Sequence, residues 1–177
     1  MTWYADLETC TYFPQRSDRL LAVGWLERKY PYTRGTTDPR VIDRFAEFLV
    51  NQGRHVPGVF LGGHSCSFCF PDDERWDQDP EGRWQFGGGS WLRMEFKGQR
   101  IQLGIANLFI PGKGVMYVAP SLMLHYMVDH GYTPPQVFSD ALLSCPPIGS
   151  EEYYDLFEQN GPHFWQEWAR RRGRQDR

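Results

Sequence analysis

Residues 64–69 read HSCSFC, and our prediction of the fold starts from this stretch. Cys66 and Cys69 are separated by two residues, so a tight turn can direct both sulfurs toward one point. Zinc prefers four ligands in a tetrahedron and binds cysteine thiolates at about 2.3 Å. We therefore expect a zinc knuckle here, with two further ligands supplied from elsewhere in the chain.

The best donors of the two missing ligands are the histidines of residues 124–131, LHYMVDHG. His125 and His130 form an H-x4-H pattern, a spacing that structural zinc sites use. On an ideal helix each residue turns by about 100°, so the two rings would lie about 140° apart. Both rings can reach one ion only if the last turn loosens, and Gly131 directly after His130 permits that. His64 competes for a place, because H-x-C-x-x-C with one helix histidine also supplies four ligands.

The same cysteines and histidines also fit roles without a metal. The two thiols could be small buried side chains, and His125 a hydrogen-bonded core histidine. His130 could be a cation at the C-terminus of a helix, where the helix dipole favours it. A thioredoxin-like redox pair would open a helix, and residues 70–73, FPDD, do not start one of that kind. We interpret Cys10 and Cys145 as structural.

Composition places the chain among folded, soluble proteins. The 177 residues suit one domain, and the 41% hydrophobic and 16% aromatic shares supply a core. A net charge of −3 argues against a surface devoted to nucleic acid, and no apolar run is long enough to span a membrane. The N-terminus lacks a basic region followed by an apolar stretch, so we expect no secretory signal, a cytoplasmic location and free thiols.

The order of the predicted elements indicates an α+β fold: a small, mainly antiparallel sheet with helices packed on it and a zinc knuckle. We expect residues 1–146 to form the zinc-containing domain and residues 147–177 a C-terminal helical extension of it. An acidic stretch with two tryptophans, residues 71–89, is predicted to be a long surface loop. Strands are predicted at 20–26, 59–61, 91–96, 100–109 and 115–118, and helices at 38–52, 120–130, 135–143 and 151–172 with a break near Gly161.

Five motifs are spread along the chain: YADL at 4–7, VGWL at 23–26, H-x-C-x-x-C at 64–69, Y-x-A-P at 117–120 and H-Y-x-x-x-H-x-Y-x-P-P-x-x-F at 125–138. Together they resemble an uncharacterised family of bacterial proteins that is frequent in actinobacteria. The resemblance spans most of residues 3–143. It implies a small cytoplasmic protein and no particular reaction.

Our preferred hypothesis is a non-catalytic, zinc-stabilised domain that binds a protein partner, in an accessory or immunity role. The acidic loop would then offer tryptophan anchors to the partner. The alternative is an enzyme with an open zinc position, with Glu95 or Asp129 as general base, or a metal-free one with Cys66 as nucleophile and His125 as base. The known hydrolase and deaminase signatures are absent. A third hypothesis has the arginine-rich end, residues 170–177, contact nucleic acid.

Overall fold

The structure is a computed structural model that describes residues 3–13, 17–52, 64–70, 76–78, 84–86 and 92–175. The described part of the chain begins with one strand and one helix, continues with six strands and ends with four helices. The strands are β1 (Leu20–Ala22), β2 (Trp76–Gln78), β3 (Trp84–Phe86), β4 (Arg93–Phe96), β5 (Gln99–Gln102), β6 (Asn107–Pro111) and β7 (Met116–Pro120). The helices are α1 (Pro39–Asn51), α2 (Met123–Asp129), α3 (Gln136–Ser144), α4 (Glu151–Asn160) and α5 (His163–Gln175).

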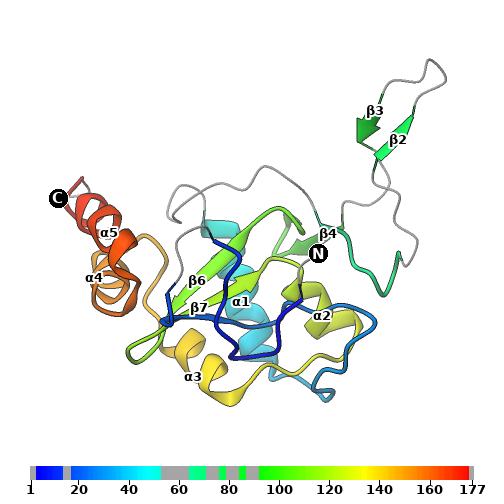
Figure 1. Cartoon of the computed structure of the whole chain (residues 1–177), viewed down its shortest axis with the longest axis horizontal. Helices are drawn as coiled ribbons and strands as arrows, with labels where there is room; N and C mark the ends of the chain where they lie inside the picture. The colour runs from blue at the N-terminus through cyan, green and yellow to red at the C-terminus, as the bar shows by residue number, and fades with distance from the viewer. Residues whose placement is uncertain are drawn as a thin grey trace.

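A three-stranded sheet in the order β1-β7-β6 forms the centre of the fold (Figure 1). β6 and β7 are antiparallel, with Phe109 opposite Val118, and every residue of both strands is buried. β1 pairs with β7 in parallel, with Leu21 opposite Tyr117. The other two strand pairs, β2 with β3 and β4 with β5, are antiparallel. The predicted α+β class with mainly antiparallel pairing is therefore confirmed.

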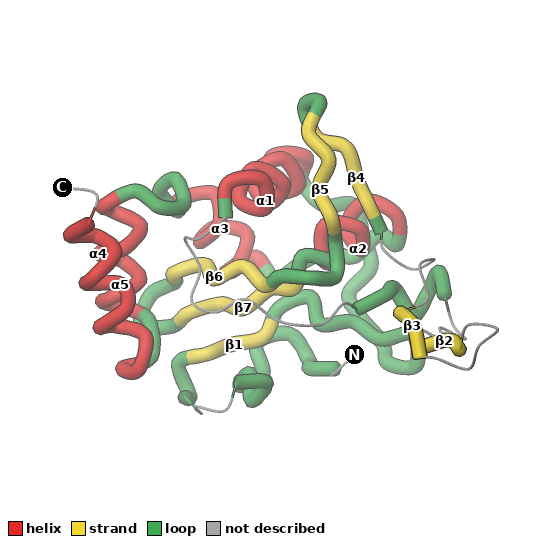
Figure 2. Tube along the Cα trace, turned by 90° about the horizontal axis from the view of Figure 1, so that it is seen from above, coloured by secondary structure: helices red, strands yellow, loops and turns green. Residues whose placement is uncertain are grey.

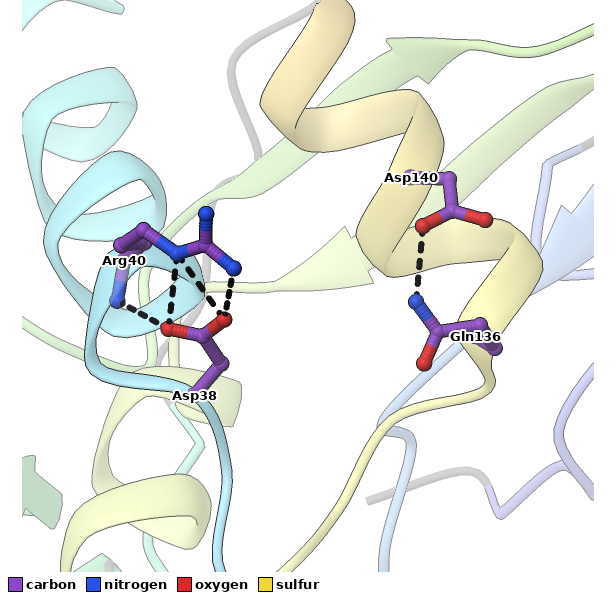
Figure 3. Close-up of polar contacts among 4 residues, drawn as sticks. All are labelled: Asp38, Arg40, Gln136 and Asp140. Atoms are coloured by element: carbon purple, nitrogen blue, oxygen red, sulfur yellow. Dashed lines mark hydrogen bonds and ion pairs between the residues drawn. The ribbon is translucent and has the colours of Figure 1, made fainter.

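The predicted first helix is confirmed with a boundary shift of one residue at each end. Asp38 caps α1 by accepting a hydrogen bond from the Arg40 N–H at 2.8 Å, and its carboxylate also pairs with the Arg40 guanidinium (Figure 3). Figure 3 also shows Gln136 donating to Asp140 one turn along α3. α1 and α3 contact each other, and Figure 2 shows them together beside the sheet, with β1 at the edge farther from α1.

The two C-terminal helices lie side by side at one end of the sheet (Figure 1). Tyr153 is fully buried, and its hydroxyl donates to the Phe109 carbonyl on β6 at 2.9 Å. Phe157 and Trp165 place their rings 6.2 and 4.7 Å from that of Phe109. Gly161 ends α4, as the sequence predicted. Aromatic packing thus joins α4 and α5 to the central sheet.

The hairpin predicted over 91–109 is only partly correct. β4 and β5 pair from Arg93 with Gln102 to Phe96 with Gln99. The return strand, β5, ends at Gln102 and does not continue to Phe109. Gly104 adopts a φ of +82°, which turns the chain, and its N–H donates to Ser121 Oγ at 2.8 Å. Residues 107–111 consequently form a separate strand that pairs with β7.

Two further predictions concern the stretch between α1 and β4. The prediction of a loop over 71–89 is wrong for Trp76–Gln78 and Trp84–Phe86, which pair as antiparallel strands. The strand predicted at 59–61 lies outside the described residues. Within the described part of the chain, no helix combines the length and the apolar character needed to cross a bilayer.

Candidate metal centre

The knuckle predicted at Cys66 and Cys69 is a turn held by its own backbone. The Phe70 N–H donates to the Cys66 carbonyl at 2.9 Å, which closes the turn over residues 67–69. The backbone N–H groups of Phe68 and Cys69 donate to the sulfur of Cys66. Ser67 Oγ accepts from the Arg28 N–H at 3.0 Å and anchors the turn to the neighbouring segment. The first sulfur is thus fixed in position by groups that stabilise a thiolate.

The two histidines are presented by α2, which follows β7 directly. His125 lies near the start of this helix and is only 5% exposed. His130 has left helical geometry, with φ −117° and ψ 4°. Gly131 has a φ of +62°, and beyond it the Tyr132 N–H returns to the Tyr126 carbonyl at 3.0 Å. The end of the helix is therefore loosened, as it must be if both histidines of an H-x4-H pattern are to bind one ion.

Four side chains converge here from two distant parts of the sequence. The ligand atoms of Cys66, Cys69, His125 and His130 all lie within 4.8 Å of one another. Cys66 Sγ is 3.3 Å from His130 Nε2, and Cys69 Sγ is 3.3 Å from His125 Nε2. Cys69 Sγ is 3.4 Å from His130 Nε2, and the two Nε2 atoms are 3.0 Å apart. These four residues are close enough to hold a metal ion.

Four of the six distances between these ligand atoms are close to those of tetrahedral coordination. A zinc tetrahedron with Zn–S near 2.3 Å and Zn–N near 2.0–2.1 Å has S···N edges of about 3.6 Å and N···N edges of about 3.3 Å. The observed S···N distances of 3.3, 3.3 and 3.4 Å and the N···N distance of 3.0 Å are shorter by a few tenths of an ångström. A small outward shift of the side chains would therefore accommodate an ion at the centre.

Asp129 fixes the orientation of one histidine. Its carboxylate lies 2.5 Å from Nδ1 of His125, one turn along α2. A proton on Nδ1 donates to this carboxylate, so Nε2 carries a lone pair directed toward the cysteines. Because Asp129 binds the edge of the ring opposite to the cluster, it is an orienting group and is not placed as a general base toward the cluster.

Burial differs across the cluster and affects its protonation. Cys66 is fully buried, whereas Cys69 is exposed and His130 is partly exposed. Burial raises the pKa of the Cys66 thiol to about 12, against the lowering effect of its two backbone donors. Burial, followed by the proximity of His125, lowers the pKa of His130 and favours its neutral form. Metal binding must therefore displace a proton from Cys66, whereas His130 is already neutral and can bind the ion directly.

The remaining candidate residues lie outside the cluster. His64 is not one of the four clustered residues, and its backbone N–H donates to the Gly104 carbonyl at 2.7 Å. Cys10 and Cys145 are free and buried. In the arginine-rich end, Arg170 pairs with Glu158 and Arg171 with Glu167.

A polar contact beside the cluster was not singled out from the sequence as a site. Asp6 accepts from the Gly24 N–H at 2.9 Å and from the Tyr132 hydroxyl at 2.8 Å. Burial raises the pKa of Asp6, and the two hydrogen bonds partly counter that rise. The sequence did contain a signal for this contact, because all three residues lie in or beside motifs noted above, in the YADL, VGWL and HGY stretches. This contact ties the N-terminal segment to the end of α2.

A comparison with known protein families identifies the family to which the segment with this cluster belongs. The model of a domain of unknown function, DUF7919, matches residues 2–143, which include all four clustered residues. The chain belongs to the DUF7919 family. The expectation of an uncharacterised family is thereby confirmed, and the DUF7919 match ends in the last turn of α3, before α4 and α5. No curated protein and no solved structure matches the chain.

Proposed function

We propose that this DUF7919 domain binds one zinc ion at a closed site formed by Cys66, Cys69, His125 and His130, and that the ion has a structural role. The observation that supports this most directly is the convergence of the four ligand atoms within 4.8 Å. The ion would join α2 to the knuckle, two segments separated by more than fifty residues. Metal binding would then contribute directly to folding, as it does in structural zinc sites.

The donor set favours zinc over other common ions. Two thiolates and two imidazoles are soft or borderline ligands, which suit zinc and not magnesium or calcium. Tetrahedral S2N2 coordination is a geometry that zinc adopts readily, because its filled d shell imposes no other preference.

A structural role follows from the number of protein ligands. A catalytic zinc keeps one position open for water and therefore has three protein ligands, whereas four protein ligands close the tetrahedron. The enzyme alternative would also need a base directed at the ion, and Asp129 instead contacts the far edge of the His125 ring. We therefore favour the non-catalytic role.

Metal content and matched cysteine variants test this proposal. We expect purified protein to hold one zinc per chain. Cys66→Ser should lose the zinc and at least about 3 kcal/mol of stability, which lowers Tm by about 6–12 °C for a chain of this size. Cys145→Ser, the same change at a buried cysteine outside the cluster, should keep the zinc. Metal-free wild-type protein that is as stable as the zinc-loaded form would contradict a structural role.

We also propose that the zinc-stabilised surface binds a protein partner in the cytoplasm. Large apolar side chains are exposed in the three segments around the cluster: Tyr30 at 36%, Phe70 at 37% and Val128 at 48%. Exposed aromatic and aliphatic side chains are typical anchors of protein interfaces. Phe70→Asp should abolish binding of a discrete partner from the native host, and Leu143→Asp, at a similarly exposed side chain on α3, should not. Equal binding by both variants would exclude this surface.

A further inference from the structure

We propose that Cys66 and Cys69 form a site of oxidative modification, at which a peroxide attacks Cys69 first and Cys66 then closes a disulfide that expels the ion. This inference rests on the proposed zinc site and adds to it a chemical reaction that controls metal occupancy. It is carried by the unequal exposure of the two sulfurs and by their proximity.

The exposed and buried sulfurs have different access to solvent. Cys69 is exposed, so a small oxidant in solution can reach its sulfur, whereas the Cys66 side chain has no exposed surface. The two sulfurs lie within 4.8 Å of each other. A disulfide at the C-x-x-C spacing is sterically accessible, as redox proteins that use the same spacing demonstrate. One sulfur is thus placed to react with the oxidant and the other to resolve the product.

The reaction balances with a hydroperoxide as the oxidant. The Cys69 thiolate attacks one peroxide oxygen, an S–O bond forms, the O–O bond breaks, and the hydroxide that leaves takes a proton from a buffer acid to become water. The Cys66 thiolate then attacks the sulfur of the Cys69 sulfenic acid, an S–S bond forms, and the S–O bond breaks with loss of a second hydroxide. In total, two thiolates, one hydrogen peroxide and two protons give one disulfide and two waters. The sulfurs are oxidised and the peroxide oxygens are reduced.

The loss of both thiolates removes half of the coordination shell. His125 on α2 and His130 directly after it remain, and two imidazoles are a weak zinc site compared with four ligands. The ion should therefore leave as the disulfide forms, and the link between α2 and the knuckle should be lost with it. A dithiol reductant with added zinc should restore both.

The other two cysteines serve as internal controls. Cys10 is 0% exposed and Cys145 is 4% exposed, so the same oxidant cannot readily reach either. Both belong to the packed core, away from the cluster of four. Oxidation should therefore be selective for the Cys66–Cys69 pair.

The test uses the purified, full-length, zinc-loaded chain and hydrogen peroxide at equimolar concentration. Released zinc is followed with a chromogenic chelator, and thiols are located by alkylation and peptide mass mapping. We expect one zinc released and one Cys66–Cys69 disulfide formed per peroxide consumed, with unchanged rates in Cys10→Ala and Cys145→Ala. A parallel sample with the chelator but without peroxide measures spontaneous release.

The outcomes separate this inference from the zinc proposal. Protein that purifies without zinc and takes up none when reduced would contradict the zinc site itself. Protein that holds zinc but keeps both the ion and its thiols in peroxide would overturn only the oxidation proposal. Oxidation mapped to Cys10 or Cys145, or a sulfinic acid on Cys69 without a disulfide, would overturn it as well.

Discussion

The two ring nitrogens of His125 have separate tasks. Nε2 meets Cys69 Sγ and His130 Nε2, whereas Nδ1 contacts the Asp129 carboxylate. A carboxylate on the outer nitrogen fixes the tautomer and increases the basicity of the inner one. The sequence could suggest His125 as a ligand but could not show which nitrogen points inward, because that depends on the rotation of α2.

The role of Asp129 leads to a prediction about metal affinity. Asp129→Ala should weaken zinc binding by about 10–100-fold, because His125 loses the partner that holds its tautomer. The measurement is competition with a chelator of known affinity. Asp155→Ala, at an exposed carboxylate on α4, should leave the affinity unchanged. Equal affinities for Asp129→Ala and wild type would show that the contact does not support the site.

Asp6 gives a prediction about pH. Burial raises its pKa in the folded chain above the usual value of 3.8, so the folded state holds the proton more tightly than the unfolded state. Its contribution to stability is fully present below the unfolded pKa and is lost as pH rises through the folded pKa. Asn at this position can still accept from Gly24 and Tyr132 but does not titrate.

Wild type should therefore lose stability relative to Asp6→Asn as pH rises from below about 4 to neutrality. Urea unfolding of both proteins across that range measures the difference, and pH effects on the cluster cancel because both carry it. A difference that stays constant, or that moves in favour of wild type, would contradict the raised pKa.

The elements that the sequence predicted best carry clear local signals. α1 has a capping aspartate, a proline in its first turn and apolar residues at helical spacing, and α4 has a serine cap and a glycine end. The return strand of the hairpin was predicted too long, because apolar residues continue from Ile101 to Phe109, whereas the positive φ of Gly104 divides them. In the fold, the Gly104 N–H donates to Ser121 Oγ, a contact that the local sequence does not reveal.

Alanine substitutions at two glycines distinguish the cost of backbone strain from the cost of a steric clash. Gly24 and Gly114 both have positive φ, of +71° and +74°. A Cβ at Gly24 would lie 2.7 Å from Met123 Cγ at the start of α2, whereas a Cβ at Gly114 meets nothing within 4 Å. Gly114→Ala should cost about 1–2 kcal/mol from backbone strain alone, and Gly24→Ala should cost more than that. Denaturant unfolding midpoints measure the stability that each variant loses. Equal losses would show that the contact with Met123 adds no cost at Gly24.

At the scale of the whole molecule, the site is assembled from segments that only the tertiary fold brings together. The C-x-x-C pattern predicted the knuckle, but whether His64 or both helix histidines complete the cluster depends on where β7 and α2 place His125 and His130. Likewise, the parallel pairing of β1 with β7 joins Leu20 to Met116, far apart in the sequence. No local pattern encodes either arrangement.

Packing of α4 and α5 on the sheet predicts cooperative unfolding of the whole chain. Phe157 is fully buried between Phe109 and Trp168, so Phe157→Ala should cost about 3–5 kcal/mol. Phe164→Ala, at a partly buried side chain of α5, should cost less. Tryptophan fluorescence and zinc release should report one transition in both variants. Separate transitions would show that residues 147–177 unfold as an independent unit.

X-ray absorption at the zinc edge of the purified, reduced chain tests the central claim most directly. We predict one zinc with two sulfur ligands at about 2.3 Å and two imidazole nitrogens at about 2.0–2.1 Å, with no oxygen ligand. A shell that contains a water oxygen, a shell without sulfur, or protein without metal would contradict the account.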